Sequence, residues 1–279
     1  MAEAVEGFWL NLQGDSERST RMHAQLATLG LQARYSRFEA SRGDAAHASS
    51  RGLSPGEEGA WRSWLAMLEQ AERSPSPVVH LLEDDVQITP ALADLLAWPL
   101  LQHHLRASHL VCTDGFVSPG QVRQLLAARP AAPGFLVIDQ GLRVPCLGSV
   151  LALPAKLTAV RLALQVLWDG SEALPPIDVA LGQLAAQGTV AFCTVAPFVT
   201  GPLLASARAS RIREPGDACL ERSREALTLL RRILMVSGEA DAIATEWIGL
   251  LQAFEPEVQQ EAFLDLLDGW IERGLVQPY

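Results

Sequence analysis

Three consecutive acidic residues, Glu83, Asp84 and Asp85, follow an apolar run that begins at Val78. An apolar run this short is typical of a buried strand. Because three carboxylates cannot all stay ionised inside a sheet, we expect them at the carboxyl end of that strand, facing water or a cation. Ligands of open α/β sheets bind at that edge, and Mg²⁺ and Mn²⁺ prefer carboxylate oxygens and often bridge phosphates. The segment therefore predicts a divalent-metal site, although a solvated acidic turn would give the same pattern.

The segments around these acids alternate between strand and helix. We expect strands near residues 7–12, 34–38, 78–82, 109–113, 135–138, 144–153 and 189–195, and helices near 16–29, 55–73, 90–96, 154–168 and 177–186. The small, polar stretch 41–52 predicts a loop. Alternation of this kind indicates a mostly parallel sheet flanked by helices. Amphipathic helical spacing replaces it from Pro215 onward, so we expect an α/β domain over residues 1–213 and an acidic, all-helical C-terminal region over 214–279.

The composition excludes several classes of function. The net charge of −10 at pH 7 argues against a nucleic-acid partner, and 13 acidic residues against 5 arginines after residue 213 carry most of it. No run approaches the roughly 18 apolar residues of a membrane span, and the acidic N-terminus lacks the pattern of a secretory signal. The four cysteines are too widely spaced to indicate a zinc cluster or a disulfide framework. We therefore expect a cytoplasmic protein with buried free thiols and without a transmembrane segment.

Four sequence blocks, taken in order, resemble glycosyltransferase family 25, the family of lipooligosaccharide and collagen galactosyltransferases. The likeness covers roughly Phe8 to Val199. The blocks are Asn11 with Arg18 and Arg21, Leu53–Gly59 with Ser63, the acidic segment Leu82–Val86, and Leu147–Leu153 followed by Pro176-Ile177-Asp178. The order of the blocks carries more weight than any one of them.

The resemblance implies a GT-A-like fold, the fold of nucleotide-diphospho-sugar transferases, and a metal-dependent, inverting reaction. Such an enzyme moves a hexose, galactose or glucose, from a UDP-sugar to a hydroxyl of a glycan, peptide or small-molecule acceptor. Mn²⁺ or Mg²⁺ neutralises the departing diphosphate as a Lewis acid. Since side chains of an extended backbone alternate in direction, we expect Glu83 and Asp85 as metal ligands, and Asp84 either near the ribose or behind the metal ligands, outside direct contact with the metal. The other donor-binding residues that the resemblance implies are Asn11, Arg18, Arg21, Gly148 and Ser149, and the acceptor-side residues are Glu57, Ser63 and Trp64.

Some of these assignments have simpler alternatives. Arg18 and Arg21 would equally suit the solvated first turns of a helix. Glu57 stands three residues after Ser54, and with Pro55 between them this is the pattern of a capping box that starts a helix. A cap is the expected primary role of Glu57.

Inversion at the sugar carbon requires a carboxylate that takes the proton of the acceptor hydroxyl. Asp114 follows a predicted strand, and Asp178 opens a predicted helix near the same edge of the sheet. A turn acid or a helix cap would occupy the same positions, and Asp178 is well placed to cap the helix that follows it. Both carboxylates are candidates for the catalytic base.

The chain departs from the family pattern at several positions. Trp64 stands where the family has histidine, Ala60 where it has cysteine, and Leu151-Ala152 where it has Ala-Tyr. These changes indicate either a different acceptor or a catalytically degenerate protein that acts as a binding or scaffolding partner. Retention of three clustered acids argues against degeneration, because they repel one another without a cation. The C-terminal region is expected to cover an apolar surface, either of the α/β domain or of a second copy in a homodimer.

Overall fold

The computed structural model describes residues 5–116, 134–139 and 145–203, together with Arg231 and Met235. The strands are β1 (Val5–Leu12), β2 (Tyr35–Ala40), β3 (Val78–Glu83), β4 (Val86–Ile88), β5 (Leu110–Cys112), β6 (Leu136–Asp139), β7 (Ser149–Ala152), β8 (Phe192–Ala196) and β9 (Thr200–Pro202). The helices are α1 (Ser16–Thr28), α2 (Ala45–Ser50), α3 (Pro55–Ala71), α4 (Ala91–Ala97), α5 (Leu101–Ala107), α7 (Pro154–Gly170) and α8 (Ile177–Ala186). No helix of these residues is both long enough and apolar enough to span a bilayer.

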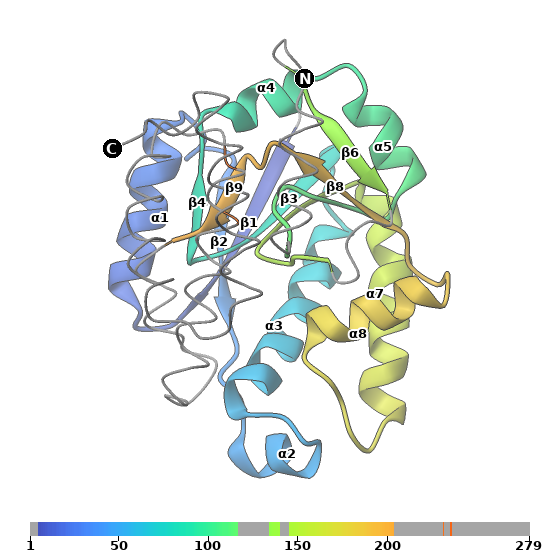
Figure 1. The fold of residues 1–279 in the computed structure, drawn as a ribbon. Helices are drawn as coiled ribbons and strands as arrows, with labels where there is room; N and C mark the ends of the chain where they lie inside the picture. Colours follow the sequence, from blue (N-terminus) through green and yellow to red (C-terminus); the bar gives the residue numbers. More distant parts are fainter. Residues whose placement is uncertain (1–4, 117–133, 140–144, 204–230, 232–234, 236–279) are drawn as a thin grey trace, which may run out of the picture.

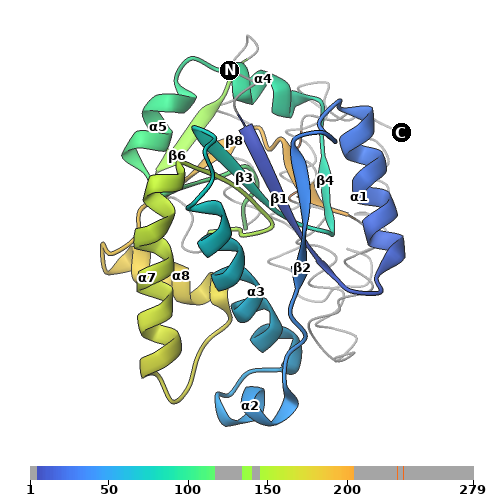
Figure 2. The ribbon, with the colours of Figure 1, turned by 180° about the vertical axis from the view of Figure 1, so that it is seen from behind.

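The centre of the molecule is a seven-stranded sheet in the order β2-β1-β3-β7-β5-β8-β6. Strands β1, β2 and β3 are parallel, and β5 and β8 run in the same direction, whereas β7 and β6 are antiparallel to their neighbours. Helices α1, α4 and α5 cover one face and α3, α7 and α8 cover the other (Figures 1 and 2). The predicted mostly parallel, helix-flanked α/β sheet is confirmed.

Strand β3 shows why the apolar run before the acids lacks alternation. Val79 and Leu81 pack into the core on the α3 and α7 face, while Val78 and Leu82 pack into the core on the α1 and α4 face. A central strand buried on both faces needs apolar residues at every position. The strand ends at Glu83, the first of the three carboxylates, so the acids lie at its carboxyl end as the sequence predicted.

One local prediction was wrong, one small sheet was not predicted, and the C-terminal prediction is not tested. The predicted loop 41–52 contains helix α2, which begins after Asp44, whose carboxylate accepts the amide hydrogen of His47 at 2.7 Å. The fully buried carboxylate of Glu58 on α3 holds α2 in place, since it contacts both the His47 ring and the Asp44 amide. The small antiparallel sheet of β4 and β9 was not predicted either, because its pairing joins segments more than a hundred residues apart. The predicted C-terminal helices and their homodimer lie outside the described residues, apart from Arg231 and Met235.

A chain of buried hydrogen bonds crosses the sheet from β2 to β9. The Tyr35 hydroxyl lies 2.7 Å from His80 Nδ1, and His80 Nε2 lies 2.7 Å from the Ser149 hydroxyl. The Thr113 hydroxyl then lies 2.5 Å from the Ser149 hydroxyl and 2.7 Å from that of Thr200. All five side chains are buried, so each polar group depends on the next for its hydrogen bond.

Gly7 makes this chain of hydrogen bonds possible. Tyr35 must cross β1 to reach His80, and a Cβ atom on Gly7 would overlap the Tyr35 ring. We therefore expect Gly7→Ala to displace the ring and to lower the free energy of unfolding by about 1–3 kcal/mol, the usual cost of overpacking a core. Urea denaturation measures it.

Gly170→Ala is the matched control for the Gly7 substitution. Nothing lies within 4 Å of a Cβ at Gly170, the last residue of α7, and alanine has a higher helix propensity than glycine. This variant should be as stable as the parent chain or slightly more so. Equal losses in the two variants would show that the Gly7 effect does not come from the Tyr35 ring.

Candidate functional site

A cavity of about 370 Å³ lies at the carboxyl ends of β1, β2 and β3. The ends of these strands contribute Asn11, Ser41 and the acidic segment Glu83–Asp85, and the N-terminal parts of α1 and α3 contribute Arg18 and Gly59. Parallel strands bring their carboxyl ends to one edge, which is where open α/β sheets bind ligands. The structure thus places the predicted acidic segment in a ligand-sized hollow.

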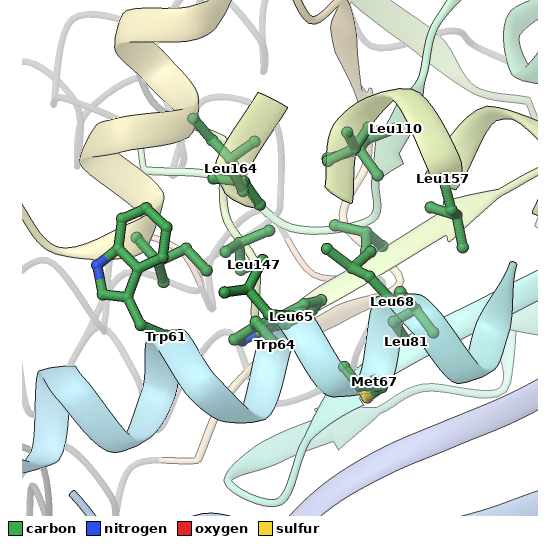
Figure 3. Close-up of a cluster of buried hydrophobic side chains, with 14 of the residues drawn as sticks. Trp61, Trp64, Leu65, Met67, Leu68, Leu81, Leu110, Leu147, Leu157 and Leu164 are labelled. Atoms are coloured by element: carbon green, nitrogen blue, oxygen red, sulfur yellow. The ribbon is translucent and has the colours of Figure 1, made fainter. Parts of the chain in front are cut away.

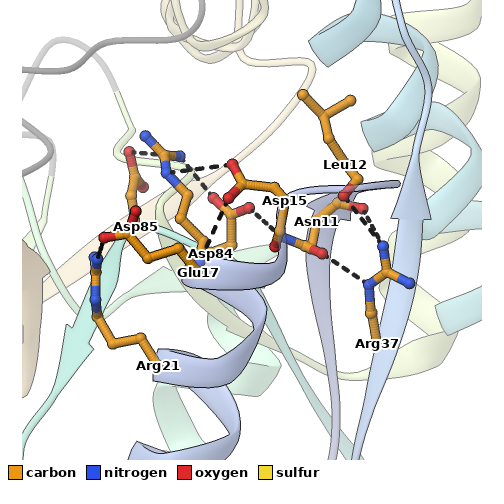
Figure 4. Close-up of polar contacts among 9 residues, drawn as sticks. Asn11, Leu12, Asp15, Glu17, Arg21, Arg37, Asp84 and Asp85 are labelled. Atoms are coloured by element: carbon orange, nitrogen blue, oxygen red, sulfur yellow. Dashed lines mark hydrogen bonds and ion pairs between the residues drawn. The ribbon is translucent and has the colours of Figure 1, made fainter.

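Asp84 is the centre of a polar network on the α1 side of this cavity (Figure 4). Its Oδ2 accepts from Asn11 Nδ2 at 2.7 Å, and its Oδ1 accepts from Arg18 Nη1 at 2.8 Å. Arg37 Nε donates to Asn11 Oδ1 at 2.8 Å, and Asp15 caps α1 by accepting from the Arg18 amide. Asp84 therefore fixes Asn11 and Arg18 at the end of β3, and its own charge is balanced by Arg18.

Asp85 is open to the cavity. Its side chain is 34% exposed, and its Oδ2 lies 3.6 Å from Arg18 Nη1. Desolvation raises the pKa of Asp85 most, Arg18 opposes that rise, and the neighbouring Asp84 adds to it. The charged form of Asp85 is therefore destabilised, and a bound cation would stabilise it.

Glu83, the last residue of β3, faces α3, whereas Asp84 faces α1, as the alternation of an extended backbone requires. Trp64 Nε1, on α3, donates to Glu83 Oε1 at 3.3 Å. Burial raises the pKa of Glu83 to about 8, and the charges of Asp85 and Asp178 add to the rise. Glu83 is thus protonated at neutral pH unless a cation favours its ionised form.

The carboxylates of Glu83 and Asp85 fit a divalent cation only if phosphate or water supplies its other ligands. Within the described residues, no three histidine, cysteine, aspartate or glutamate side chains are grouped so as to hold one ion. Mg²⁺, however, is usually held by one or two carboxylates while substrate phosphates and water complete its coordination. The assignment of Glu83 and Asp85 as ligands remains a prediction that depends on such a phosphate ligand.

Asp114, a candidate base, is fully buried just after β5 and forms an ion pair with Arg231. Arg231 Nε donates to Asp114 Oδ1 at 3.1 Å, and Nη2 donates to Oδ2. Arg231 was missed by the sequence analysis, since it belongs to no motif and lies 117 residues from its partner. The signal that could have found it is a pair of arginines, Arg231 and Arg232, within an acidic region.

Asp178, the other candidate base, lies in the first turn of α8. Its Oδ1 accepts from the Val179 amide at 2.9 Å. The predicted helix cap is wrong, because α8 begins at Ile177 with Pro176 in the N-cap position and no side-chain cap. Asp178 is close enough to Glu83 to raise the pKa of that residue. Asp178 thus belongs to the Glu83 side of the sheet edge, whereas Asp114 lies beside Arg231.

Several predicted site residues do not line the cavity. Arg21 pairs with Glu17 on the surface of α1, and Glu57 completes the predicted capping box with Ser54 (Figure 4 shows the Arg21 pair). The Ser149 hydroxyl is used inside the buried chain of hydrogen bonds, and the Gly148 carbonyl accepts from the Glu83 amide at 2.9 Å. The predicted residues that do line it are Asn11, Arg18, Ser63, Glu83, Asp84 and Asp85, and the lining residues that were missed include Asp15 and Arg42.

Of the two predicted acceptor-side residues on the inner part of α3, Ser63 lines the cavity and Trp64 lies in the core. The Ser63 hydroxyl lines the cavity, donates to the Gly59 carbonyl at 2.6 Å and accepts from the Ser41 amide at 2.8 Å. Trp64 is 1% exposed and packs in the core between α3 and β3 (Figure 3). Trp64 touches the site only through its indole N–H, which reaches Glu83.

Comparison with known proteins gives distant similarities. No protein-family model matches the chain, and no curated protein matches it. One similar solved structure is the galactosyltransferase LgtC in complex with donor and acceptor sugar analogues, at 12% identity and a TM-score of 0.40, over 88% of this chain and 99% of that chain. Another is mannose-1-phosphate geranyltransferase from Thermus thermophilus, at 13% identity and a TM-score of 0.32, over 69% of this chain and 73% of that chain. By its own residues, the chain is an α/β protein with a cavity lined by acidic residues at the ends of its parallel strands.

Proposed function

We propose that this chain is a glycosyltransferase that binds a nucleotide-diphosphate sugar in the cavity at the ends of β1, β2 and β3. The proposal rests on one observation: Asp85, Arg18 and Glu83 line the same cavity of about 370 Å³. An acidic group that favours a cation, next to a fixed guanidinium, suits a metal-bound diphosphate. The family resemblance narrows the donor to a UDP-hexose and the metal to Mn²⁺ or Mg²⁺.

The wall formed by α3 suits the nucleoside. Of the α3 residues that line the cavity, Gly56, Gly59 and Ala60 have little or no side chain, and Gly43, in the segment that follows β2, lines the cavity as well. Residues with little or no side chain leave a flat surface on which a base or a ribose can lie. Larger residues at Gly43 or Gly59 would also meet backbone atoms, because the two segments already touch.

Each group then has a role in transfer. Asp85, with Glu83 where it ionises, would hold the cation, which supplies the positive charge that the departing diphosphate needs. Arg18 adds a fixed positive charge beside the phosphates, and Asp84 keeps it in place. Asp114 or Asp178 takes the proton from the acceptor hydroxyl, and attack from the opposite face inverts the sugar carbon.

Asp85→Asn should remove the metal-dependent part of nucleotide binding. Isothermal titration of UDP into the parent chain is expected to show tighter binding with Mn²⁺ than with a chelator. In Asp85→Asn the affinity with Mn²⁺ should fall about tenfold or more, because one anionic oxygen ligand is lost.

Asp94→Asn on α4 is the control, since Asp94 carries the same charge and does not line the cavity. This variant should bind UDP as the parent chain does. If all three proteins bind UDP equally with and without Mn²⁺, the cation has no part in the site.

A catalytically degenerate binding protein is the second candidate function. It is favoured by Trp64, which fills the core where the family has histidine, and by the engagement of both Asp114 oxygens with Arg231. The discriminating measurement is release of UDP from UDP-galactose or UDP-glucose. Nucleotide binding without release, in the presence of glycan, peptide and small-molecule acceptors, would support the degenerate protein.

A further inference from the structure

We propose that Arg231 is a second phosphate-contacting arginine of this site, and that Asp114 is the positioning residue that holds it there. The inference rests on the proposed binding of a nucleotide diphosphate. It assigns a ligand contact to a residue of the C-terminal region and gives Asp114 a role other than that of base.

The Arg231 guanidinium is held rigidly. Two of its nitrogens donate to the two oxygens of Asp114, and Nη2 also lies 2.9 Å from Cys146 Sγ. Its Cζ atom stands 4.9 Å from the centre of the Phe116 ring. A planar guanidinium fixed by a bidentate carboxylate and a ring face has one orientation, which is the property that recognition of phosphate requires.

Met235 makes a second contact between this part of the sequence and the described fold. Met235, four residues after Arg231, forms a bridge with Phe198 and lies over Gly201 of β9. A Cβ at Gly201 would overlap the Met235 side chain. Arg231 and Met235 therefore both contact segments that adjoin the sheet.

In the order of the sheet, Arg231 lies beyond β3 from Arg18. It contacts Asp114 just after β5 and Cys146 just before β7, whereas Arg18 binds Asp84 together with Asn11 of β1. A Cβ built on Gly148 would lie 4.0 Å from Arg231 Nη2, and the Gly148 carbonyl accepts from the Glu83 amide. A cation on Asp85 would thus lie between two arginines from opposite ends of the chain, and so would the diphosphate bound to it.

The guanidinium keeps capacity for a ligand. Its contacts use Nε and Nη2, and within the part of the chain that the structure describes Nη1 has no hydrogen-bond partner. The side chain is 13% exposed. Since Asp114 already uses both oxygens on Arg231, the proton-accepting role in the proposed reaction falls to Asp178.

The test is calorimetric titration of UDP and of uridine in the presence of Mn²⁺. Arg231→Met should weaken UDP binding by about tenfold to a hundredfold, the usual effect of losing a charge-assisted contact, and leave uridine binding unchanged. Arg231→Lys should retain part of the UDP affinity, because lysine keeps the positive charge but lacks the paired N–H donors of the guanidinium. Arg73→Met, which removes an arginine from the exposed Glu69 pair, is the matched control and should bind both probes normally.

The double variant Arg231→Met, Asp114→Asn guards against misfolding. It leaves no unpaired buried carboxylate, so it should fold, and it should still show the loss of UDP affinity. If this double variant binds UDP as the parent chain does, the inference is overturned while the proposed function stands. If the parent chain itself binds neither UDP nor uridine, the proposed function fails first.

The role of Asp114 is decided by adding Asp114→Asn to the Arg231→Met background. A residue that acts only by holding Arg231 has nothing left to hold there, so turnover and UDP affinity should not change further. A further loss of turnover of about tenfold or more, at constant UDP affinity, would make Asp114 the base and overturn its positioning role.

Discussion

Replacing Trp64 with alanine is expected to lower the free energy of unfolding by about 3–5 kcal/mol. The indole is 1% exposed and packs among Leu65, Leu68 and Leu81 in the core under α3 (Figure 3). Alanine would leave a cavity that a sheet covered by helices cannot close, and it would also remove the donor to Glu83. Urea denaturation followed by far-UV circular dichroism, which does not depend on tryptophan fluorescence, measures the loss.

Trp64→Phe separates packing from the hydrogen bond. Phenylalanine keeps most of the apolar volume, so this variant should lose much less stability than Trp64→Ala while leaving Glu83 without the indole N–H. A Trp64→Ala variant that stays as stable as the parent chain but loses acceptor binding would place the side chain in the acceptor site and refute the core assignment.

The stability of the fold should also fall in acid because of His80. Burial lowers the pKa of His80 to about 3, against about 6.5 in an unfolded chain. Below pH 6.5 the unfolded chain takes up a proton on this histidine that the folded chain refuses, so stability is lost progressively as the pH falls towards 3. By pH 4.5 the loss from His80 amounts to about 2–3 kcal/mol.

His80→Gln isolates this effect, because glutamine stays neutral and can still hydrogen-bond to Tyr35 or Ser149. The comparison matters, since the raised pKa of Glu83 acts in the opposite direction: folded Glu83 keeps a proton that the unfolded chain releases above pH 4.5. Glu83 is common to both proteins, so the difference in their unfolding free energies reports His80. If the free energies of unfolding of the parent chain and of His80→Gln change equally between pH 7 and 4.5, His80 is not buried in its neutral form.

The sequence by itself determined the parts of this protein that depend on neighbouring residues. The apolar run Val78–Leu82 specified a central strand, and the three acids after it specified where that strand leaves the core. The Ser54 capping box specified the start of α3, because a cap is formed by residues three positions apart. From these elements the helix-flanked α/β sheet and the acidic edge followed.

Only the tertiary structure decided which of the acidic and basic groups are neighbours. Asp84 is joined to Asn11 across 73 residues and Asp114 to Arg231 across 117, and no local pattern encodes a pairing at such a separation. The position of Trp64 in the core, with its N–H on Glu83, likewise depends on how α3 packs against β3. Charge and hydrophobicity along a chain specify which residues leave water, whereas the partners they meet are set by how the helices and strands pack together.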